Sequence, residues 1–188
     1  MEDFLYNLLK DDIKVKDKIS TFSTLFRLKR LKKDNFVVRI DDLNDRVGFL
    51  KEGVLRSFVS DYEGNEANVR FIQAYDIISG GFSFNTPSPV NIQAITNAEA
   101  YFVSWKELQQ FLSSNREFLH FLNKYLAKGS QKTTELLSNF IRLNAEGRYK
   151  IFIKEYPELL ELIPHYHIAN FLGISPVQLS RIRKNDDF

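Results

Sequence analysis

The 188-residue sequence contains no cysteine, one tryptophan and three histidines. Without cysteine the chain forms no disulfide bonds, no thiolate sites for zinc or iron–sulfur clusters, and no thiol nucleophile. The net charge is only +2, so affinity for nucleic acid has to come from local clusters of Lys and Arg. No apolar run approaches the roughly 20 residues that span a membrane, and the first residues lack the pattern of a signal peptide. We therefore expect a soluble, cytoplasmic protein with no membrane partner.

The three histidines, His120, His165 and His167, all lie outside the β-like part of the sequence. A metalloenzyme built on a β-roll needs histidines and carboxylates clustered within the sheets. His165 and His167 are two residues apart, which predicts different faces of one helix, both at its surface. The Gly80-Gly81 pair lacks the spacing and the lysine of a nucleotide-phosphate loop. The sequence thus predicts no catalytic residues, no metal site and no cofactor.

What the sequence does have is an apolar share of 44%, with seventeen Phe and eight Tyr, which is enough for a packed core. Residues 2 to 26 carry apolar positions at helical spacing, which predicts one or two short helices. From about Leu28 to Val103 the pattern changes to short β-like runs separated by turn residues. No helix-length segment interrupts these runs, so the pattern favours an antiparallel sandwich or jelly-roll over a parallel sheet.

Helices resume at Ser104, where Glu107 stands at capping-box spacing. After a break at residues 113–115, a long helix is predicted from about Arg116 to Ile141. Gly129 in its middle costs about 1 kcal/mol of helix propensity relative to alanine, and permits close approach of another helix or a ligand. A second break at residues 144–147 and a further helix over residues 148–156 follow. These helices and the preceding strands together predict an α+β fold.

The last twenty-odd residues predict two short helices joined by a tight turn. Gly173 tolerates the positive φ that such a turn requires. Ser175 is a suitable N-cap for the second helix, with Pro176 in the first helical position and Gln178 at capping-box spacing. The core-facing positions are Ile168, Ala169, Leu172, Leu179 and Ile182. This pattern is typical of a helix-turn-helix, whose second helix can enter the DNA major groove. The alternative is a helical hairpin that only closes a core.

The order of parts resembles the Crp–Fnr family of bacterial transcription regulators across essentially the whole chain. The resemblance is carried by Ala145-Glu-Gly-Arg-Tyr149 and by Ile168-Ala-x-x-Leu-Gly-Ile-Ser-x-x-x-Leu-Ser-Arg-Ile182. Gly53-Val-Leu-Arg56 and Phe71-Ile-x-x-Tyr-Asp-Ile-Ile78 are similar to strand motifs of the family. The resemblance implies a cyclic-nucleotide-binding-type β-roll with flanking helices over residues 1–114 and a long dimerisation helix over residues 115–142. It further implies a winged-helix-type helix-turn-helix over residues 143–188, a homodimer, and contacts with double-stranded DNA and RNA polymerase.

The resemblance also implies an effector pocket in the roll, formed by the segment from Ser79 to Val90 and by the long helix. The predicted lining consists of Ser79, Gly80, Gly81, Phe82, Ser88, Thr133 and Thr134. This sequence departs from the family, however, because no arginine occurs from Phe71 through Asn115 to meet a phosphate. Losing such a cation typically costs about 2–5 kcal/mol. We therefore expect an unidentified small-molecule effector, or none, and not cyclic AMP.

In the recognition helix, residues 175–184, the sequence predicts two kinds of DNA contact. The residues predicted to contact base edges are Val177, Gln178 and Arg181, since Gln suits adenine, Arg suits guanine and Val can touch a thymine methyl. The residues predicted to contact phosphates are Ser175, Ser180, Arg183 and Lys184. Only four residues follow Lys184, so the wing is trimmed relative to the family, and weaker DNA binding is expected. The competing hypothesis is a ligand-binding or protein-interaction module with a vestigial helix-turn-helix that does not bind DNA.

Overall fold

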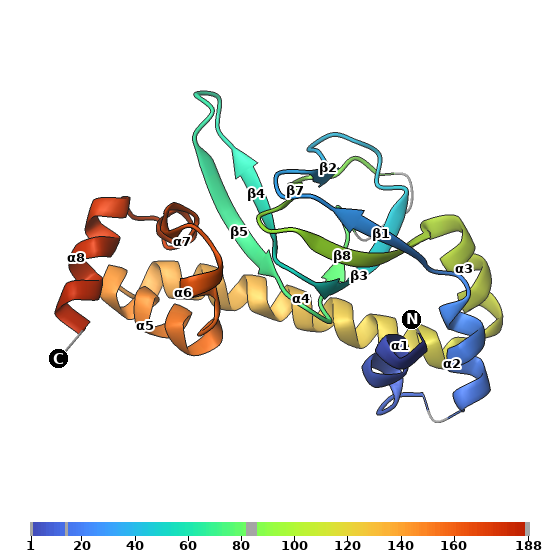
Figure 1. Ribbon diagram of the computed structural model, residues 1–188. Helices are drawn as coiled ribbons and strands as arrows, with labels where there is room; N and C mark the ends of the chain where they lie inside the picture. The colour runs from blue at the N-terminus through green and yellow to red at the C-terminus, as the bar shows by residue number, and fades with distance from the viewer. Residues whose placement is uncertain (1, 14, 82–85, 187–188) are drawn as a thin grey trace.

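The computed structural model describes residues 2–13, 15–81 and 86–186. Two short helices come first, followed by eight strands and then six helices (Figure 1). The helices are α1 (Glu2–Leu9), α2 (Lys16–Ser23), α3 (Trp105–Ser114), α4 (Arg116–Arg142), α5 (Ala145–Glu155), α6 (Leu159–Leu162), α7 (His165–Phe171) and α8 (Pro176–Asp186). The strands are β1 (Arg27–Leu31), β2 (Phe36–Val38), β3 (Arg46–Glu52), β4 (Leu55–Ser60), β5 (Glu66–Ile72), β6 (Ile77–Ile78), β7 (Asn91–Ala94) and β8 (Ala98–Ser104). This arrangement is α+β, as the sequence predicts.

The strands form two four-stranded antiparallel sheets, ordered β1-β8-β3-β6 and β2-β7-β4-β5. The core between the sheets contains Leu50, Leu55, Ile72, Ile92 and Ala100, all buried. Because side chains alternate along a strand, Val47 and Phe49 of β3 face the opposite way from Leu50 and join a second core. The predicted antiparallel roll is therefore confirmed.

That second core lies between the roll and the helices α1, α2, α3 and the start of α4, at one end of the molecule (Figure 1). Aromatic rings dominate it: Phe22 and Phe118 lie 4.7 Å apart between ring centroids, and Phe121 and Tyr125 the same. Ser104 and Glu107 form the predicted capping box at the start of α3. The first turns of α4 are thereby fixed to the roll.

Helix α4 runs along the roll and reaches the C-terminal helices at the other end of the molecule (Figure 1). Its bounds agree with the predicted long helix. The next helix, α5, begins earlier than expected, at Ala145, because the Asn144 side chain accepts a hydrogen bond from the Gly147 N–H at 2.9 Å. Gly147 thus lies in the first helical turn and not in a break. Helix α6 was not expected. No described helix is both long and apolar enough for a membrane span.

Candidate nucleic-acid interface and effector cavities

Helices α7 and α8 pack as the sequence predicts. Ile168, Ala169 and Leu172 are buried against Leu179 and Ile182 of α8 in one apolar cluster. Gly173 in the turn has φ +65°, and a Cβ there would lie 2.7 Å from the Phe140 ring of α4. The turn therefore requires glycine both for its backbone conformation and for its close approach to α4.

The opposite face of α8 is open to solvent. Val177, Gln178 and Arg181 are exposed, as are Ser175, Ser180 and Lys184. The predicted division of α8 into a buried face and a free face is thus confirmed. The Gln178 side chain already takes part in the cap of α8. Its Oε1 accepts a hydrogen bond from the Ser175 N–H at 3.0 Å, and Ser175 Oγ accepts one from the Gln178 N–H at 3.2 Å. Because the Gln178 Oε1 is used in the cap, only the Nε2 amino group is free to contact a base. A bidentate contact with adenine needs both atoms, so it would require the cap to open.

Arg183 is half-buried, and its Nη1 donates to the ring of His165 at 2.9 Å. His165 is exposed, as expected. His167 is not: it is 4% exposed, so its prediction as a surface residue is wrong. The reason is that α7 packs on the roll as well as on α8, so two of its faces are covered. The described residues contain no group of three metal-ligating side chains.

Helix α7 contacts strand β5 through polar side chains. The Asn170 amide accepts from the Asn68 N–H and donates to the Glu66 carbonyl, thereby pairing with the backbone of β5 as a neighbouring strand would. Asn68 donates in turn from its Nδ2 to the His167 carbonyl at 2.9 Å. We call these residues, Glu66, Asn68, His167 and Asn170, the α7–β5 contact. Sequence reasoning missed it, because a contact about one hundred residues apart leaves no local pattern.

A buried arginine extends this contact into the sheet. Arg56 of β4 is 5% exposed and donates to Gln93 of β7 at 3.0 and 2.7 Å, to Asn68 at 3.2 Å, and to Glu66. Its guanidinium also lies over the Phe58 ring, 3.8 Å from the centroid. The charge is thus neutralised by Glu66 and fixed by neutral acceptors, as a buried cation requires.

His167 titrates abnormally as a result of this packing. Burial lowers its pKa to about 4, and the positive charge of Arg56 acts in the same direction. Its Nδ1 is buried and has no hydrogen-bond partner within residues 2–13, 15–81 and 86–186. The imidazole is therefore neutral at physiological pH, which keeps an uncompensated charge out of the interior.

Ser79 and Gly80, from the predicted effector segment, line a cavity of about 360 Å³. Asn44 organises it, donating to Ser79 Oγ at 3.3 Å and to the Gly81 carbonyl at 3.1 Å. Ser88 is fully buried and donates to the Val90 carbonyl at 2.7 Å. Phe82 lies outside the described residues. We call this the loop cavity.

Charge in the loop cavity disfavours an anion. Arg46, which lines it, is bound to Asp45 through Nε at 2.7 Å and Nη2 at 3.2 Å. Asp42 also lines it. The described lining therefore presents more negative than free positive charge to a phosphate, which supports the expectation that cyclic AMP is not the effector.

Thr133 and Thr134 are not part of the loop cavity. Both line a separate cavity of about 300 Å³ between β5 and α4, which we call the α4–β5 cavity. Their hydroxyls donate to the Gly129 and Ser130 carbonyls at 3.2 and 3.1 Å. The structure thus brings Ser79, Gly80, Gly81 and Ser88 together, and places the two threonines elsewhere.

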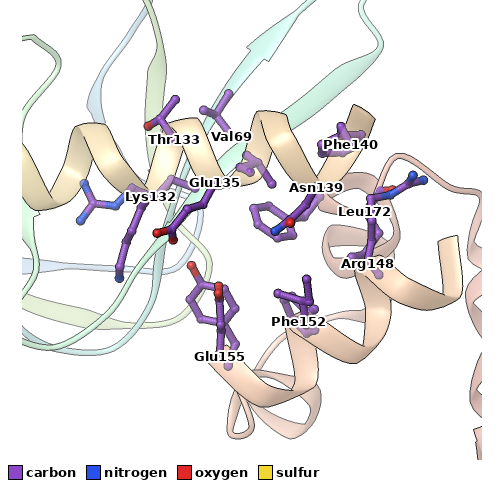
Figure 2. Close-up of a pocket in the computed structure, with 15 residues that line it drawn as sticks. Val69, Lys132, Thr133, Glu135, Asn139, Phe140, Arg148, Phe152, Glu155 and Leu172 are labelled. Atoms are coloured by element: carbon purple, nitrogen blue, oxygen red, sulfur yellow. The ribbon is translucent and has the colours of Figure 1, made fainter. Parts of the chain in front are cut away.

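Thr133 also lines a smaller cavity, of about 50 Å³, between β5, α4, α5 and α7 (Figure 2). Lys132 and Glu135 extend into it from α4, and Glu155 from α5. At its other end Arg148 donates to the Leu172 carbonyl at 3.0 Å and to the Leu143 carbonyl at 2.9 Å. Arg148, from the Ala145–Tyr149 motif, thereby joins the end of α4 to the turn between α7 and α8.

Comparison with known proteins agrees with this geometry. Residues 28–115 match the model of the cyclic nucleotide-binding domain. No curated protein sequence matches the chain. Among solved structures, FixK2 from Bradyrhizobium japonicum is similar with a TM-score of 0.78 and 16% identity, over 85% of this chain and 83% of that one.

Two further structures are similar over most of the chain. The c-di-GMP responsive global regulator CLP of Xanthomonas campestris has a TM-score of 0.70 and 16% identity, over 91% of each chain. A putative transcriptional regulator of the Crp/Fnr family from Eubacterium rectale has a TM-score of 0.69 and 16% identity, over 94% of this chain and 85% of that one. The resemblance read from the sequence is therefore confirmed. The chain has the fold of the Crp–Fnr regulators, and its residues 28–115 are similar to the cyclic nucleotide-binding domain.

Proposed function

We propose that the chain is a dimeric, DNA-binding transcription regulator whose roll senses a small molecule other than cyclic AMP. The observation that carries the proposal is α8: its apolar face is buried, and its free face presents Arg181 and Val177 together. We keep the division into a sensor region (1–114), a connecting helix (115–142) and a DNA-binding region (143–188) as part of the proposal. Contact with RNA polymerase stays a prediction from the family resemblance.

Dimerisation through α4 is supported by its exposed apolar side chains. Leu119, Leu137 and Ile141 are 43%, 63% and 76% exposed, and with half-buried Leu126 they follow one side of the helix. Large apolar side chains on one line favour a self-complementary two-fold contact. Leu137→Glu should convert a dimer into a monomer in light scattering. A wild-type chain that is monomeric at micromolar concentration would contradict this part of the proposal.

Arg181 provides the sharpest test of DNA binding. Arg181→Ala should weaken specific binding by about 1–3 kcal/mol and relax preference at one base pair per half-site, because guanine loses a bidentate partner. Gln178→Ala should have the smaller effect of the two, since Gln178 caps α8. Lys184→Ala should weaken all sequences alike and lower the salt slope by about one.

The measurement is fluorescence anisotropy with selected genomic fragments and random DNA at two salt concentrations. Lys106→Ala, an exposed cation on α3, serves as the matched control and should change nothing. Equal losses of specific and non-specific affinity in Arg181→Ala would make this arginine a phosphate contact. Absence of any salt-dependent DNA binding in the wild type would favour the interaction module with a vestigial helix-turn-helix.

A further inference from the structure

A cavity of about 240 Å³ lies between the first residue of α7 and one flank of α8, and we call it the α7–α8 cavity. The polar part of its lining consists of His165, Ser180, Arg183 and Lys184. Among the described side chains, no carboxylate forms an ion pair with Arg183 or Lys184. Two cations without a carboxylate partner, beside a hydroxyl, suit an oxyanion such as a phosphate group.

His165 fixes the direction of one of these cations. The Nη1 of Arg183 lies 2.9 Å from His165 Nδ1 and 3.0 Å from His165 Nε2. His165 Nε2 also lies 3.1 Å from the Leu160 carbonyl oxygen. A carbonyl can only accept, so the hydrogen-bond pattern assigns the ring proton to Nε2 and leaves Nδ1 as the acceptor for the guanidinium. A ring that accepts from Arg183 is neutral, so it holds the arginine without cancelling its charge.

Arg183 keeps most of its donors for a ligand. Within the part of the chain that the structure describes, His165 is its only hydrogen-bond partner, and Nη1 is the only nitrogen engaged. Nε and Nη2 are therefore available for a bidentate contact with two oxygens of one phosphate group. A long side chain that is already held loses less rotamer freedom when it binds. His165 thus lowers the entropic cost of a contact that it does not itself make.

We propose that His165 is a positioning residue, which holds the Arg183 guanidinium at the α7–α8 cavity for contact with a phosphate of the DNA backbone. This inference deepens the proposed function and rests on it, since the phosphate belongs to bound DNA. It gives His165 a role where the sequence predicts only a residue at the helix surface. Sequence reasoning missed the pair because His165 and Arg183 lie 18 residues apart, on different helices.

A double-mutant cycle with random-sequence DNA tests the proposal. Binding is followed by fluorescence anisotropy at several salt concentrations and at pH 8. Arg183→Ala should lower the salt slope by about one, because one phosphate contact is lost. His165→Ala should weaken binding by about two- to tenfold and keep the wild-type slope, since the arginine is still present but has to be ordered on binding. In the Arg183→Ala background, His165→Ala should have no further effect.

Two further variants separate positioning from folding. His165→Gln should retain most of the wild-type affinity, because its Oε1 can accept from Arg183. His120→Ala, at an exposed histidine of α4, is the matched control and should bind as the wild type does. If His165→Ala weakens binding by the same factor in both backgrounds, it acts on the structure of α7 alone and the proposal is wrong. A fall of the salt slope by one in His165→Ala would make His165 itself the phosphate contact, which also contradicts the proposal.

A measurement without DNA makes the test independent of the proposed regulator. The ¹⁵N signal of the Arg183 Nε–H, identified by its loss in Arg183→Ala, reports the order of the side chain and its response to inorganic phosphate. The wild-type signal should be ordered and should shift with phosphate, whereas His165→Ala should make it mobile and reduce the shift. Equal mobility in both proteins, or no response to phosphate, overturns the proposal. A phosphate response in a chain that does not bind DNA would contradict the proposed regulator and leave the pairing of His165 with Arg183 intact.

Discussion

The roll is held on its two flanks by different chemistry. On the flank of α1, α2, α3 and the start of α4, buried contacts are almost entirely apolar, with Phe49, Phe118 and Phe121 at the centre. On the flank of α7, an apolar cluster around Phe71 is accompanied by the α7–β5 contact, in which Asn68 and Asn170 bind backbone groups. The first flank is stabilised by buried apolar area, whereas the second is stabilised also by hydrogen bonds, which depend on the direction of donor and acceptor.

This difference has an energetic meaning. Apolar burial contributes about 25 cal/mol per Å² and tolerates small shifts, so the first flank is stable as long as it excludes water. A neutral hydrogen bond contributes only about 0.5–1.5 kcal/mol net, because water replaces it when the surfaces separate. The hydrogen bonds of the α7–β5 contact therefore specify the position of the C-terminal helices, while most of the free energy that holds them there comes from the apolar cluster around Phe71.

The largest expected effect is on the apolar flank. Phe121→Ala should lower the free energy of unfolding by about 3–5 kcal/mol, because the ring is 1% exposed and its removal leaves a cavity. Denaturant titration followed by circular dichroism measures this loss. Tyr62→Ala, at an exposed turn residue between β4 and β5, is the control and should change stability by less than about 0.5 kcal/mol. A loss below about 1 kcal/mol for Phe121→Ala would contradict the apolar account.

Next in size is the pH dependence of the polar flank. His167 has a pKa of about 4 in the folded chain and about 6.5 when unfolded. The unfolded chain therefore binds more protons between these values, and stability should fall as the pH drops from about 6.5 to 4, by up to about 3 kcal/mol.

Denaturant titrations at several pH values measure this slope. His167→Gln should flatten the slope in that window, whatever it does to stability at pH 7. His120→Gln, at an exposed histidine of α4, should retain the wild-type slope. If both variants keep the wild-type slope, His167 is not the group that titrates.

The smallest expected effect on stability is that of removing one side-chain amide, at Asn170. Asn170→Ala removes the two hydrogen bonds to the backbone of β5 and should cost about 1–2 kcal/mol. Amide hydrogen exchange at the Asn68 N–H should accelerate while exchange within β3 and β8 stays unchanged. Asn123→Ala, at an exposed residue of α4, is the control. Accelerated exchange throughout the roll would show that the two flanks are one cooperative unit.

The sequence predicts most of the fold because its elements are marked locally. Ser104 with Glu107, and Ser175 with Gln178, are caps whose partners lie three residues apart, and both form as expected. The two faces of α8 are likewise a periodic signal. His167 was misassigned because its burial comes from β5, about one hundred residues away in the chain.

The candidate sites were less predictable than the fold. The exposed face of α8 follows from periodicity, and the structure agrees. The predicted effector residues came from a family pattern, and the structure places Ser79 and Gly80 at one cavity and Thr133 and Thr134 at another. Arg56 was missed, since an arginine in a strand gives no sign of whether it faces water, a carboxylate or a helix until the topology is known.

Asn170 also protects the edge of the sheet from pairing with another copy of the chain. Strand β5 ends its sheet, and an exposed edge offers unpaired N–H and C=O groups to which another chain can add a strand. In the described arrangement the Asn170 amide pairs with two of these groups, at Glu66 and Asn68. Separation of the C-terminal helices from β5 would expose that edge as a template for self-association. Loss of the Asn170 amide would therefore carry a hazard of aggregation.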